Sequence, residues 1–380
     1  MKVKLSEAFD LQMGKTPSRN NSSYWGPGYK WVSIADMGGS EKYISKTKET
    51  ITGIAVSESG IKVVPQNTVI MSFKLSIGKT AITHENMYTN EAIMAFLDKG
   101  TYNIDTDYFY HLCKGVDWVT GTNKAVLGLT LNKATMSEKE IEIPPVEEQR
   151  EAVAVLDKVD ELISLRKQQL TKLDELVKAR FVELFGATSA DKCSKRIKDY
   201  AEVLGGYAFK SELFCFNAVP VIRISNINNG CVELDYNICF DELFWAQNKR
   251  FRAEQNDILM AMSGATTGKA GIYREDIPAL INQRVACIRA KEGIAYPTFL
   301  FVATQLEWMY DLIQETSAGC AQPNISGKQI ENMPVPDATY EQQQQFAAFV
   351  EQTDKSKLAI QQSLDKLETL KKSLMQKYFG

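Results

Sequence analysis

The chain has 380 residues, more than one ordinary hydrophobic core needs, so we expect at least two domains. Hydrophobic residues make up 44% of the chain and charged residues 24%, as in soluble globular proteins. The 44 Lys and Arg residues are balanced by 47 Asp and Glu residues, which gives a formal charge of −3. This balance excludes a protein held on nucleic acid or membrane by bulk charge, although local basic surfaces remain compatible with it.

No run approaches about 18 uninterrupted apolar residues, and residues 1–10 hold no apolar signal segment, so we expect a cytoplasmic protein without membrane contact. The seven cysteines form no CxxC pair, and their odd number favours reduced thiols over a disulfide or zinc framework. They are Cys113, Cys193, Cys215, Cys231, Cys239, Cys287 and Cys320. With only two histidines, His84 and His111, a hydrolase built on His chemistry is disfavoured.

In chain order, residues 1–145 come first and have the pattern of short strands broken by turns. Tyr29–Ile34, Val63–Phe73 and Ala92–Leu97 are examples of such strands. Pro144-Pro145 ends this pattern, and no Gly or Pro follows until Gly186. Because Pro before acidic residues starts helices and Gly ends them, we predict a strand-rich domain over 1–145 and a long helix over 146–186.

The second half of the chain repeats this order. Asn67–Met71 recurs as Asn256–Met260, and Gly78-Lys79 recurs as Gly268-Lys269, in each case about 190 residues later. Three further matches keep the same order and nearly the same offset, which indicates an internal duplication. We therefore predict a second strand-rich domain over 187–335 and a second long helix over 336–380.

Both predicted helices carry apolar residues at alternating steps of three and four, the spacing of a coiled-coil seam. The seam residues are Leu156, Val159, Ile163, Leu170, Leu173, Val177, Val350, Ile360, Leu364, Leu367 and Leu374. Where the first helix has Arg166 and Arg180, its repeat partner has Ile360 and Leu374, which favours two helices specialised for each other. The predicted fold class is α+β: two similar strand-rich α/β domains separated by two long antiparallel helices that form a coiled-coil spacer, with a pseudo-twofold internal repeat.

The spacer would fix a distance, since about 38 residues at ~1.5 Å each give a rod near ~57 Å. The alternative is that each helix merely caps its own domain.

The familiar catalytic motifs are absent from the sequence. Gly78-Lys79-Thr80 has the ending of a phosphate-binding P-loop, but the first Gly of that motif is missing. In Ser263–Lys269 the first Gly stands one residue too close. Lys79 and Lys269 are therefore expected at exposed hairpin tips. Dinucleotide, zinc-protease, nucleophile-elbow and methyltransferase motifs do not occur, so we expect no catalytic residue, no metal site and no cofactor bound by this chain.

The repeated order of strand-rich domain, proline junction and long helix resembles the specificity subunit of Type I restriction-modification systems, and the resemblance covers the whole chain. The segments that carry it are Gly14–Ser18, the two Gly-Lys turns, Gln322–Ser326, the junction Ile143–Gln149 and the second junction Met333–Gln345. In that family the strand-rich domains are target recognition domains for double-stranded DNA with a bipartite site. The helices are its spacer regions.

The resemblance implies that two modification (methyltransferase) subunits dock on the spacer and supply S-adenosylmethionine chemistry. It also implies that restriction/translocase subunits add ATP- and Mg-dependent cleavage. None of these activities is implied for this chain itself. The different polar loops of the two domains imply an asymmetric target.

Polar loops with amide, Arg and Lys side chains suit base edges and phosphates. The candidate DNA-binding residues are Lys15, Ser18, Arg19, Asn20, Asn21, Lys74, Lys79, Lys210, Arg223, Asn226, Asn228, Arg250, Lys269, Arg284 and Gln322. An ordinary solvated loop side chain is the alternative for each of them. Asn226 and Asp36 also have the pattern of turn caps, Arg284 could pair with an internal acid, and Trp25 and Trp31 are expected in the core.

Neither strand-rich segment has the strong basic excess of a free-standing DNA binder, so we expect weak DNA affinity in isolation. The alternative function is a coiled-coil adaptor that scaffolds two unlike protein partners without nucleic acid.

Overall fold

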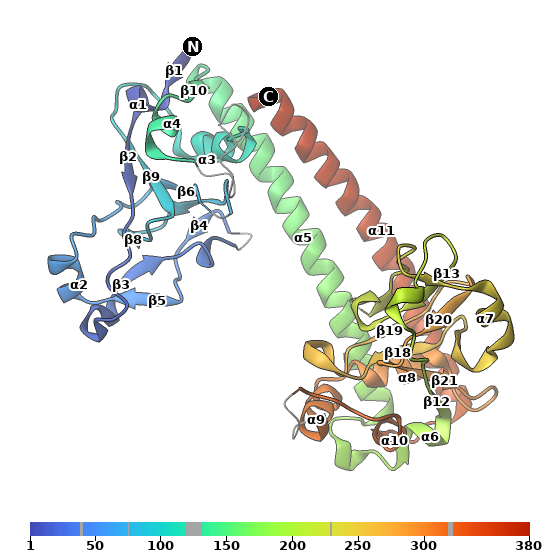
Figure 1. Ribbon diagram of the computed structural model, residues 1–380. Helices are drawn as coiled ribbons and strands as arrows, with labels where there is room; N and C mark the ends of the chain where they lie inside the picture. The colour runs from blue at the N-terminus through green and yellow to red at the C-terminus, as the bar shows by residue number, and fades with distance from the viewer. Residues whose placement is uncertain (39–40, 75, 119–130, 229, 318–321) are drawn as a thin grey trace. The chain divides into compact units, whose positions relative to one another are not determined.

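The computed structural model describes residues 1–38, 41–74, 76–118, 131–228, 230–317 and 322–380. The chain forms two compact units, residues 1–167 with 362–380, and residues 168–361 (Figure 1). Each unit contains one strand-rich domain and a part of both long helices. The six described cysteines are free thiols, and Cys320 lies outside the described residues.

The first unit has a five-stranded main sheet with the order β2-β9-β6-β7-β4 and a smaller sheet with the order β5-β3-β8. All four residues of β6 are buried, which places that strand in the centre of the core. The strands are β1 (Lys2–Lys4), β2 (Phe9–Met13), β3 (Trp25–Val32), β4 (Tyr43–Ile44), β5 (Glu49–Ile51), β6 (Val69–Ser72), β7 (Thr80–Thr83), β8 (Tyr88–Thr89), β9 (Ile93–Asp98) and β10 (Glu140–Glu142). The helices are α1 (Leu5–Ala8), η1 (Ser22–Tyr24), η2 (Asp36–Gly38), α2 (Gly53–Glu58), α3 (Thr106–Gly115) and α4 (Lys133–Ser137).

The second unit repeats this topology, which confirms the predicted duplication. Its larger sheet has the order β12-β21-β18-β19-β15-β14, and its smaller sheet has the order β16-β13-β20-β17. The strands are β11 (Lys195–Arg196), β12 (Ala201–Gly205), β13 (Val219–Ile222), β14 (Ile227–Asn228), β15 (Cys231–Val232), β16 (Cys239–Phe240), β17 (Arg252–Ala253), β18 (Ile258–Ala261), β19 (Ala270–Ile272), β20 (Ala279–Ile281), β21 (Val285–Ala290) and β22 (Pro334–Val335).

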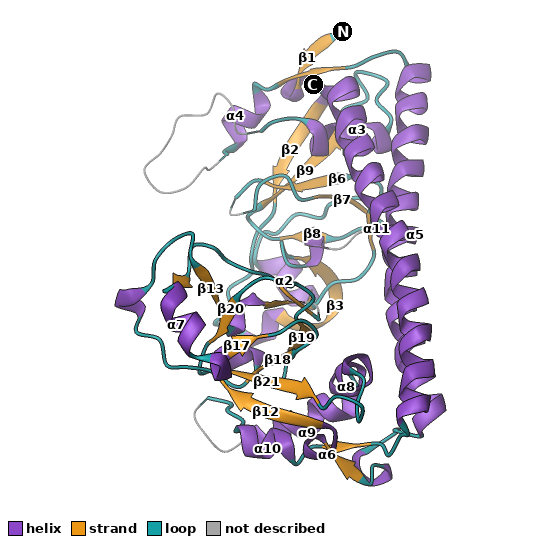
Figure 2. Ribbon diagram, turned by 90° about the vertical axis from the view of Figure 1, so that its right-hand side faces the viewer, coloured by secondary structure: helices purple, strands orange, loops and turns teal. Residues whose placement is uncertain are grey.

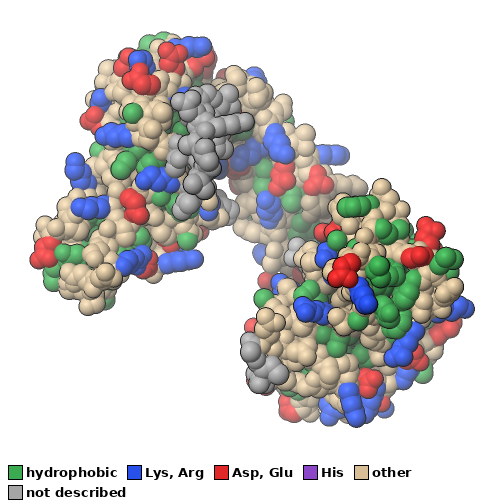
Figure 3. Space-filling view, viewed as in Figure 1, with side chains coloured by type: hydrophobic (Ala, Val, Ile, Leu, Met, Phe, Trp, Pro, Cys, Tyr) green, Lys and Arg blue, Asp and Glu red, His purple; other side chains and the backbone are tan. Residues whose placement is uncertain are grey.

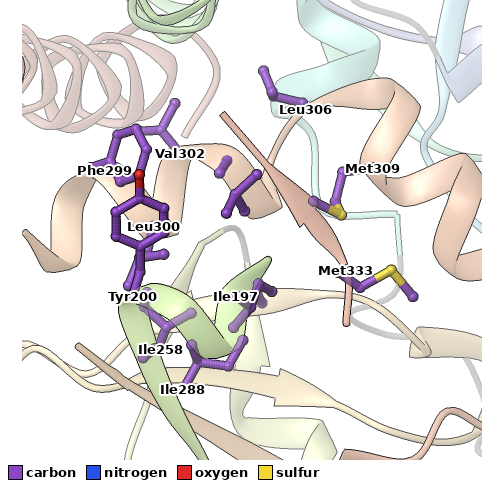
Figure 4. Packing of buried hydrophobic residues seen from close by; sticks show 14 of the residues in the cluster. Ile197, Tyr200, Ile258, Ile288, Phe299, Leu300, Val302, Leu306, Met309 and Met333 are labelled. Atoms are coloured by element: carbon purple, nitrogen blue, oxygen red, sulfur yellow. The ribbon is translucent and has the colours of Figure 1, made fainter. Parts of the chain in front are cut away.

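The shorter helices of the second unit lie among these strands (Figure 2). They are η3 (Ala190–Lys192), α6 (Ile197–Tyr200), η4 (Ser211–Leu213), η5 (Ile224–Asn226), α7 (Glu242–Gln247), η6 (Lys249–Phe251), η7 (Gly264–Thr266), α8 (Pro297–Thr304), α9 (Glu307–Ser317) and α10 (Gly327–Glu331). Buried side chains from α6, α8 and α9 pack on those of β18 and β21, as Figure 4 shows for Tyr200, Ile258, Ile288 and Phe299.

A glycine that directly follows the first main-sheet strand is required in both domains. A Cβ atom on Gly14 would lie 2.2 Å from the carbonyl oxygen of Asn90, and one on Gly206 would lie 2.2 Å from that of Asn282. No side chain fits at such distances, since carbon and oxygen repel well before them. The two positions are repeat equivalents, so the close backbone approach belongs to the shared fold.

The long helices α5 (Val146–Phe185) and α11 (Tyr340–Phe379) are each 40 residues long, which confirms the predicted helices. All eleven predicted seam residues are buried or half-buried, and Leu156, Val159, Val177, Val350 and Leu364 are the most buried. Burial at every position of a three-four spacing confirms the apolar seam.

The helices pair antiparallel within each unit. In the first unit, Asp160 is bonded to Lys371, and Lys167 lies 3.1 Å from Glu368. In the second unit, Asp174 lies 2.6 Å from Lys357, and the rings of Phe181 and Phe346 are 5.3 Å apart. Lys357 and Lys371, which occupy polar positions of the three-four spacing in α11, are thus matched by acids of α5.

A buried glutamine joins each domain to its long helix. The side chain of Gln149 accepts the backbone N–H of Asp105 at 2.9 Å and donates to the carbonyls of Asn103 and Pro144. Gln343, its repeat equivalent, accepts the N–H of Tyr296 at 2.9 Å and donates to the carbonyls of Ile294 and Ala338. Both glutamines are fully buried. We call these two arrangements the amide clasps, and they explain why a Gln stands in both junction motifs.

Candidate nucleic-acid interface

The loops of the first domain meet where β2 ends, β9 begins and β6 turns into β7. Antiparallel pairing places Met13 opposite Met94 and Ser72 opposite Ile93. The backbone N–H of Gly14 donates to Ile93, so the following loop lies beside the start of β9. We call residues 14–18, 72–74, 76–80 and 90–92 the first polar edge.

Four predicted DNA-binding residues lie at the first polar edge, Ser18 and three lysines. Lys15 is exposed, whereas Lys74 and Lys79 are half-buried. The ammonium of Lys74 lies 5.2 Å from the ring centre of Phe73. The alkyl chains of both loop lysines pack on the domain. Lys79 is therefore less exposed than the hairpin-tip position predicted from the sequence.

Within residues 18–21, Arg19 and Asn21 make contacts inside their own domain. The guanidinium of Arg19 lies 3.7 Å from the ring centre of Trp25 and makes a two-pronged ion pair with Glu49. The hydrogen bond with Arg19 lowers the pKa of Glu49, and that with Glu49 raises the pKa of Arg19. Asn21 caps η1 by accepting the N–H of Ser23.

The indole of Trp25 donates to the carbonyl of Ser18 at 3.2 Å, and Asn20 is exposed. Trp31 is 2% exposed, as expected of a core residue, while Trp25 is half-buried against it. The structure therefore uses Arg19 and Asn21 to hold the loop, and leaves Ser18 and Asn20 at its surface.

The second domain brings predicted residues together at the equivalent place. Met262 donates its N–H to the carbonyl of Arg284 at 2.9 Å, and Gly264 donates to that of Pro323 at 3.1 Å. These bonds join the β18–β19 turn to the start of β21 and to the segment that begins at Gln322. We call residues 262–269, 282–284 and 322–325 the second polar edge. Lys269, Arg284 and Gln322 are all exposed there.

Arg223 and Asn226 stand on the turn that follows β13. Asn226 is 7% exposed, accepts the N–H of Arg223 at 2.9 Å and donates to the carbonyl of Glu233 at 2.8 Å. Asp36 of the first domain accepts the N–H of Ser33 at 2.8 Å in the same way. Both turn caps are confirmed, and the Asn226 amide is used within its own domain.

The other candidates lie away from the polar edges. Asn228 is exposed and donates to the carbonyl of Ser225. Lys210 and Arg250 are exposed beside η4 and η6, in the part of the domain built on the smaller sheet. The hydroxyls of Ser263 and Thr266 also lie in the second polar edge. The sequence analysis did not select these two residues, although the Gly-rich pattern around them could have indicated them.

The described residues contain no cluster of His, Cys, Asp and Glu that could hold a metal ion. One His-Asp pair exists in the first unit, where Nε2 of His111 lies 2.6 Å from Asp157, which also lies 2.8 Å from Lys42. His111 is 1% exposed, and its burial lowers its pKa. Because this imidazole is closed off from solvent, the pair is suited to joining α3 to α5 rather than to acting on a substrate.

Charges of both signs intersperse over the visible face of each unit (Figure 3). Among the described residues on that face, neither unit shows a continuous basic surface. Within the described residues, no helix has the length and apolar character needed to cross a membrane.

Two repeated domains with equivalent polar edges, each joined to a pair of long helices, define a two-part recognition protein. A family model described as "Type I restriction modification DNA specificity domain" matches residues 1–175 and 191–371. The chain belongs to this family.

Similar proteins are described as specificity subunits of Type I restriction enzymes. The MjaIX specificity subunit of Methanocaldococcus jannaschii is 26% identical over 294 residues, which cover 71% of this chain and 67% of that protein. The EcoBI specificity subunit of Escherichia coli is 24% identical over 306 residues, which cover 72% of this chain and 64% of that protein. The matched stretches thus span about two thirds of the length of these relatives.

Solved structures share the fold. The Type I restriction-modification S subunit of M. genitalium aligns over 100% of this chain and 96% of its own, with a TM-score of 0.54 and 15% identity. A chain from a study of assembly and conformational transition in the type I R-M system aligns over 100% and 97%, with a TM-score of 0.60 and 17% identity. Family membership gives this chain the role of a DNA sequence-recognition subunit, and the protein-only adaptor has no support.

Proposed function

We propose that each strand-rich domain reads one half of a bipartite, asymmetric site in double-stranded DNA. The observation that carries this proposal is the repeated polar edge: the β6–β7 and β18–β19 turns and the starts of β9 and β21 form it in both domains, but most of its side chains differ. Lys15, Lys74 and Lys79 stand at the first edge, whereas Lys269, Arg284 and Gln322 stand at the second. Different side chains on one scaffold suit two unlike half-sites, because base edges are read by side-chain donors and acceptors.

The paired helices would set the gap between the half-sites. Their apolar seam and the ion pairs Asp160–Lys371 and Asp174–Lys357 fix one helix register. A fixed register gives a constant spacing, and half-sites on one face of B-DNA recur about every 34 Å, or ~10 base pairs. Deleting one heptad from both helices, ~10 Å of rise, should change the preferred gap.

The modification (methyltransferase) subunits would dock on the spacer, two per chain. Support comes from leucines that the seam does not use: Leu165, Leu176, Leu358 and Leu370 are 45%, 49%, 61% and 47% exposed. Exposed leucines on a helix suit a partner that covers them. Restriction/translocase subunits would join this assembly.

We further propose that this chain is non-catalytic and cytoplasmic. S-adenosylmethionine, ATP and Mg would then be bound by the partner subunits. Since both signs of charge intersperse on its surface, DNA affinity of the isolated chain should be weak, with the partners completing the contact. Nanomolar binding of its specific duplex by the chain alone, at physiological salt, would contradict this dependence.

A domain exchange tests the function. Residues 1–145 are replaced by the recognition domain of another specificity subunit, and the methylated motif is read by sequencing the host genome. One half-site should change while the other half-site and the gap remain. A change in both halves, or no DNA methylation pattern that depends on this chain, would contradict the proposal.

A further inference from the structure

The β18–β19 turn contains polar atoms whose burial the fold alone does not explain. Oγ of Ser263 and Oγ1 of Thr266 are shielded from solvent and have no hydrogen-bond partner among the described residues. Nε of Arg223 is in the same state. An unpaired buried donor lowers stability, so native proteins keep one chiefly where a ligand or a functional step uses it.

These three atoms come from segments that meet at the second polar edge. A Cβ atom on Gly264 would lie 4.0 Å from Cδ1 of Ile224, the residue after Arg223. Asn282 donates its N–H to the carbonyl of Ile222 at 3.0 Å, which joins the end of β13 to the same edge. The side chains of Arg223, Ser263 and Thr266 are each half-buried, so they lie at the surface of the domain.

The turn keeps its shape without these hydroxyls. Oγ1 of Thr267 donates to the carbonyl of Gly264 at 2.7 Å, and the amide of Gln314 donates to the carbonyl of Thr267 at 2.8 Å. Gly268 adopts a φ of +85°, and a Cβ atom there would lie 2.8 Å from Cγ2 of Ile313. Thr267, Gly268 and Gln314 therefore hold the turn, and Ser263 and Thr266 are free to serve a ligand.

Two cationic side chains, Lys269 and Arg284, lie at the same polar edge as these hydroxyl donors. Lys269 and Arg284 are exposed, and neither has an ion-pair partner within 4.0 Å in the described part of the chain. The first domain differs here, because Oγ of Ser72 is bonded to the carbonyl of Ser76 and accepts the N–H of Lys79 at 3.1 Å. The buried hydroxyl of Ser72 thus has partners within its own turn, whereas those of Ser263 and Thr266 have none among the described residues.

We infer that the second polar edge binds a phosphodiester group of the DNA backbone. Ser263 and Thr266 donate their hydroxyls, and Lys269 and Arg223 supply positive charge. Nη2 of Arg223 also lies 3.8 Å from Asp235, and its buried Nε has no partner among the described residues. A phosphate suits this set, because its oxygens only accept hydrogen bonds, whereas a base edge offers both donors and acceptors. The site rests on the proposed function and adds a sequence-independent contact that sets the register of the second domain on the duplex.

The test uses the full chain and a random-sequence duplex, because phosphate contacts need no target sequence. The double variant Ser263→Ala/Thr266→Ala should bind about tenfold more weakly at low salt. Its melting temperature should stay equal to that of the wild type or rise, since the change removes unpaired buried hydroxyls. Lys269→Gln should lower the slope of log affinity against log salt by about 0.9, whereas the double variant should keep the wild-type slope.

Ser137→Ala is the matched control, because its exposed hydroxyl is already bonded to the carbonyl of Lys133. This control should change neither affinity nor melting temperature. Unchanged duplex affinity in the double variant, or a melting temperature lowered in step with affinity, would overturn the phosphate site. If the wild-type chain bound no duplex, alone or with modification subunits, the proposed function itself would fail.

Discussion

The two domains join the long helices through different chemistry. In the second unit, Phe181 of α5 and Phe346 of α11 are fully buried and pack with Phe299 of α8. In the first unit, Ala152 takes the place of Phe346, and the repeat equivalent of Val302 is His111. The first junction therefore has less aromatic volume and more polar contact.

The polar contact of the first junction is a small ionic network. Asp157 of α5 lies 2.6 Å from Nε2 of His111 and 2.8 Å from Lys42, and Lys42 lies 2.7 Å from Asp107. Burial by itself would raise the pKa of Asp157, but hydrogen bonds from Lys42 and His111 lower it. Apolar packing tolerates small shifts, whereas these bonds require one geometry. The comparison teaches that duplicated domains can keep one topology while their attachments to the spacer diverge.

The largest effect is expected at the aromatic junction. Phe346→Ala should lower the free energy of unfolding by roughly 3–5 kcal/mol, because it leaves a cavity among fully buried rings. Denaturant titration of the full chain measures this loss. Phe216→Ala is the control, since that ring is 72% exposed, and an equal loss in both variants would contradict the packing role.

The amide clasps should be nearly equal in strength. Gln149→Ala and Gln343→Ala should each cost about 2–3 kcal/mol, because each leaves a buried N–H and buried carbonyls without a partner. Amide hydrogen exchange at Asp105 and Tyr296 should increase in the matching variant alone. A loss of stability in one of the two variants but not in the other would show that the clasps are not equivalent.

The ionic network should give a smaller loss. Asp157→Ala should cost about 1–2 kcal/mol, since Lys42 and His111 lose their shared partner while partial exposure of the carboxylate reduces the effect. The repeat-equivalent change Glu351→Ala should leave the free energy of unfolding unchanged, because Glu351 is exposed and pairs with Lys355 on its own helix. Equal losses would contradict the difference between the junctions.

The smallest effect is a pH dependence confined to the first junction. Burial holds the pKa of His111 below its ordinary value of 6.5, so the unfolded chain takes up a proton there before the folded chain does. The free energy of unfolding therefore falls as pH drops through and below 6.5, because protonation of His111 then favours the unfolded chain. His111→Gln should flatten the stability profile between pH 7.5 and 5.5, as denaturant titration at each pH would show. An unchanged profile in that variant would contradict this role of His111.

The repeat could be predicted because matching segments recur in the same order about 190 residues later, and the long helices and their seam could be predicted because their signals are local. Proline and glycine mark the helix ends, and three-four spacing shows in any window of the helix. The His111–Asp157 contact could not be predicted, since it joins residues 46 positions apart without a periodic pattern. The candidate site was predicted in part: Lys269, Arg284 and Gln322 do gather, but the stacking of Arg19 on Trp25 depends on tertiary packing that its loop sequence does not reveal.

The amide clasps also bear on how such a protein can change over generations. Each clasp meets its domain only through backbone atoms and one glutamine side chain, so it does not depend on which loops the domain carries. Genetic exchange that cuts the chain beside a clasp would deliver a foreign domain whose backbone already fits the glutamine. New target sequences could then arise by shuffling whole domains, with no need to rebuild the clasp each time.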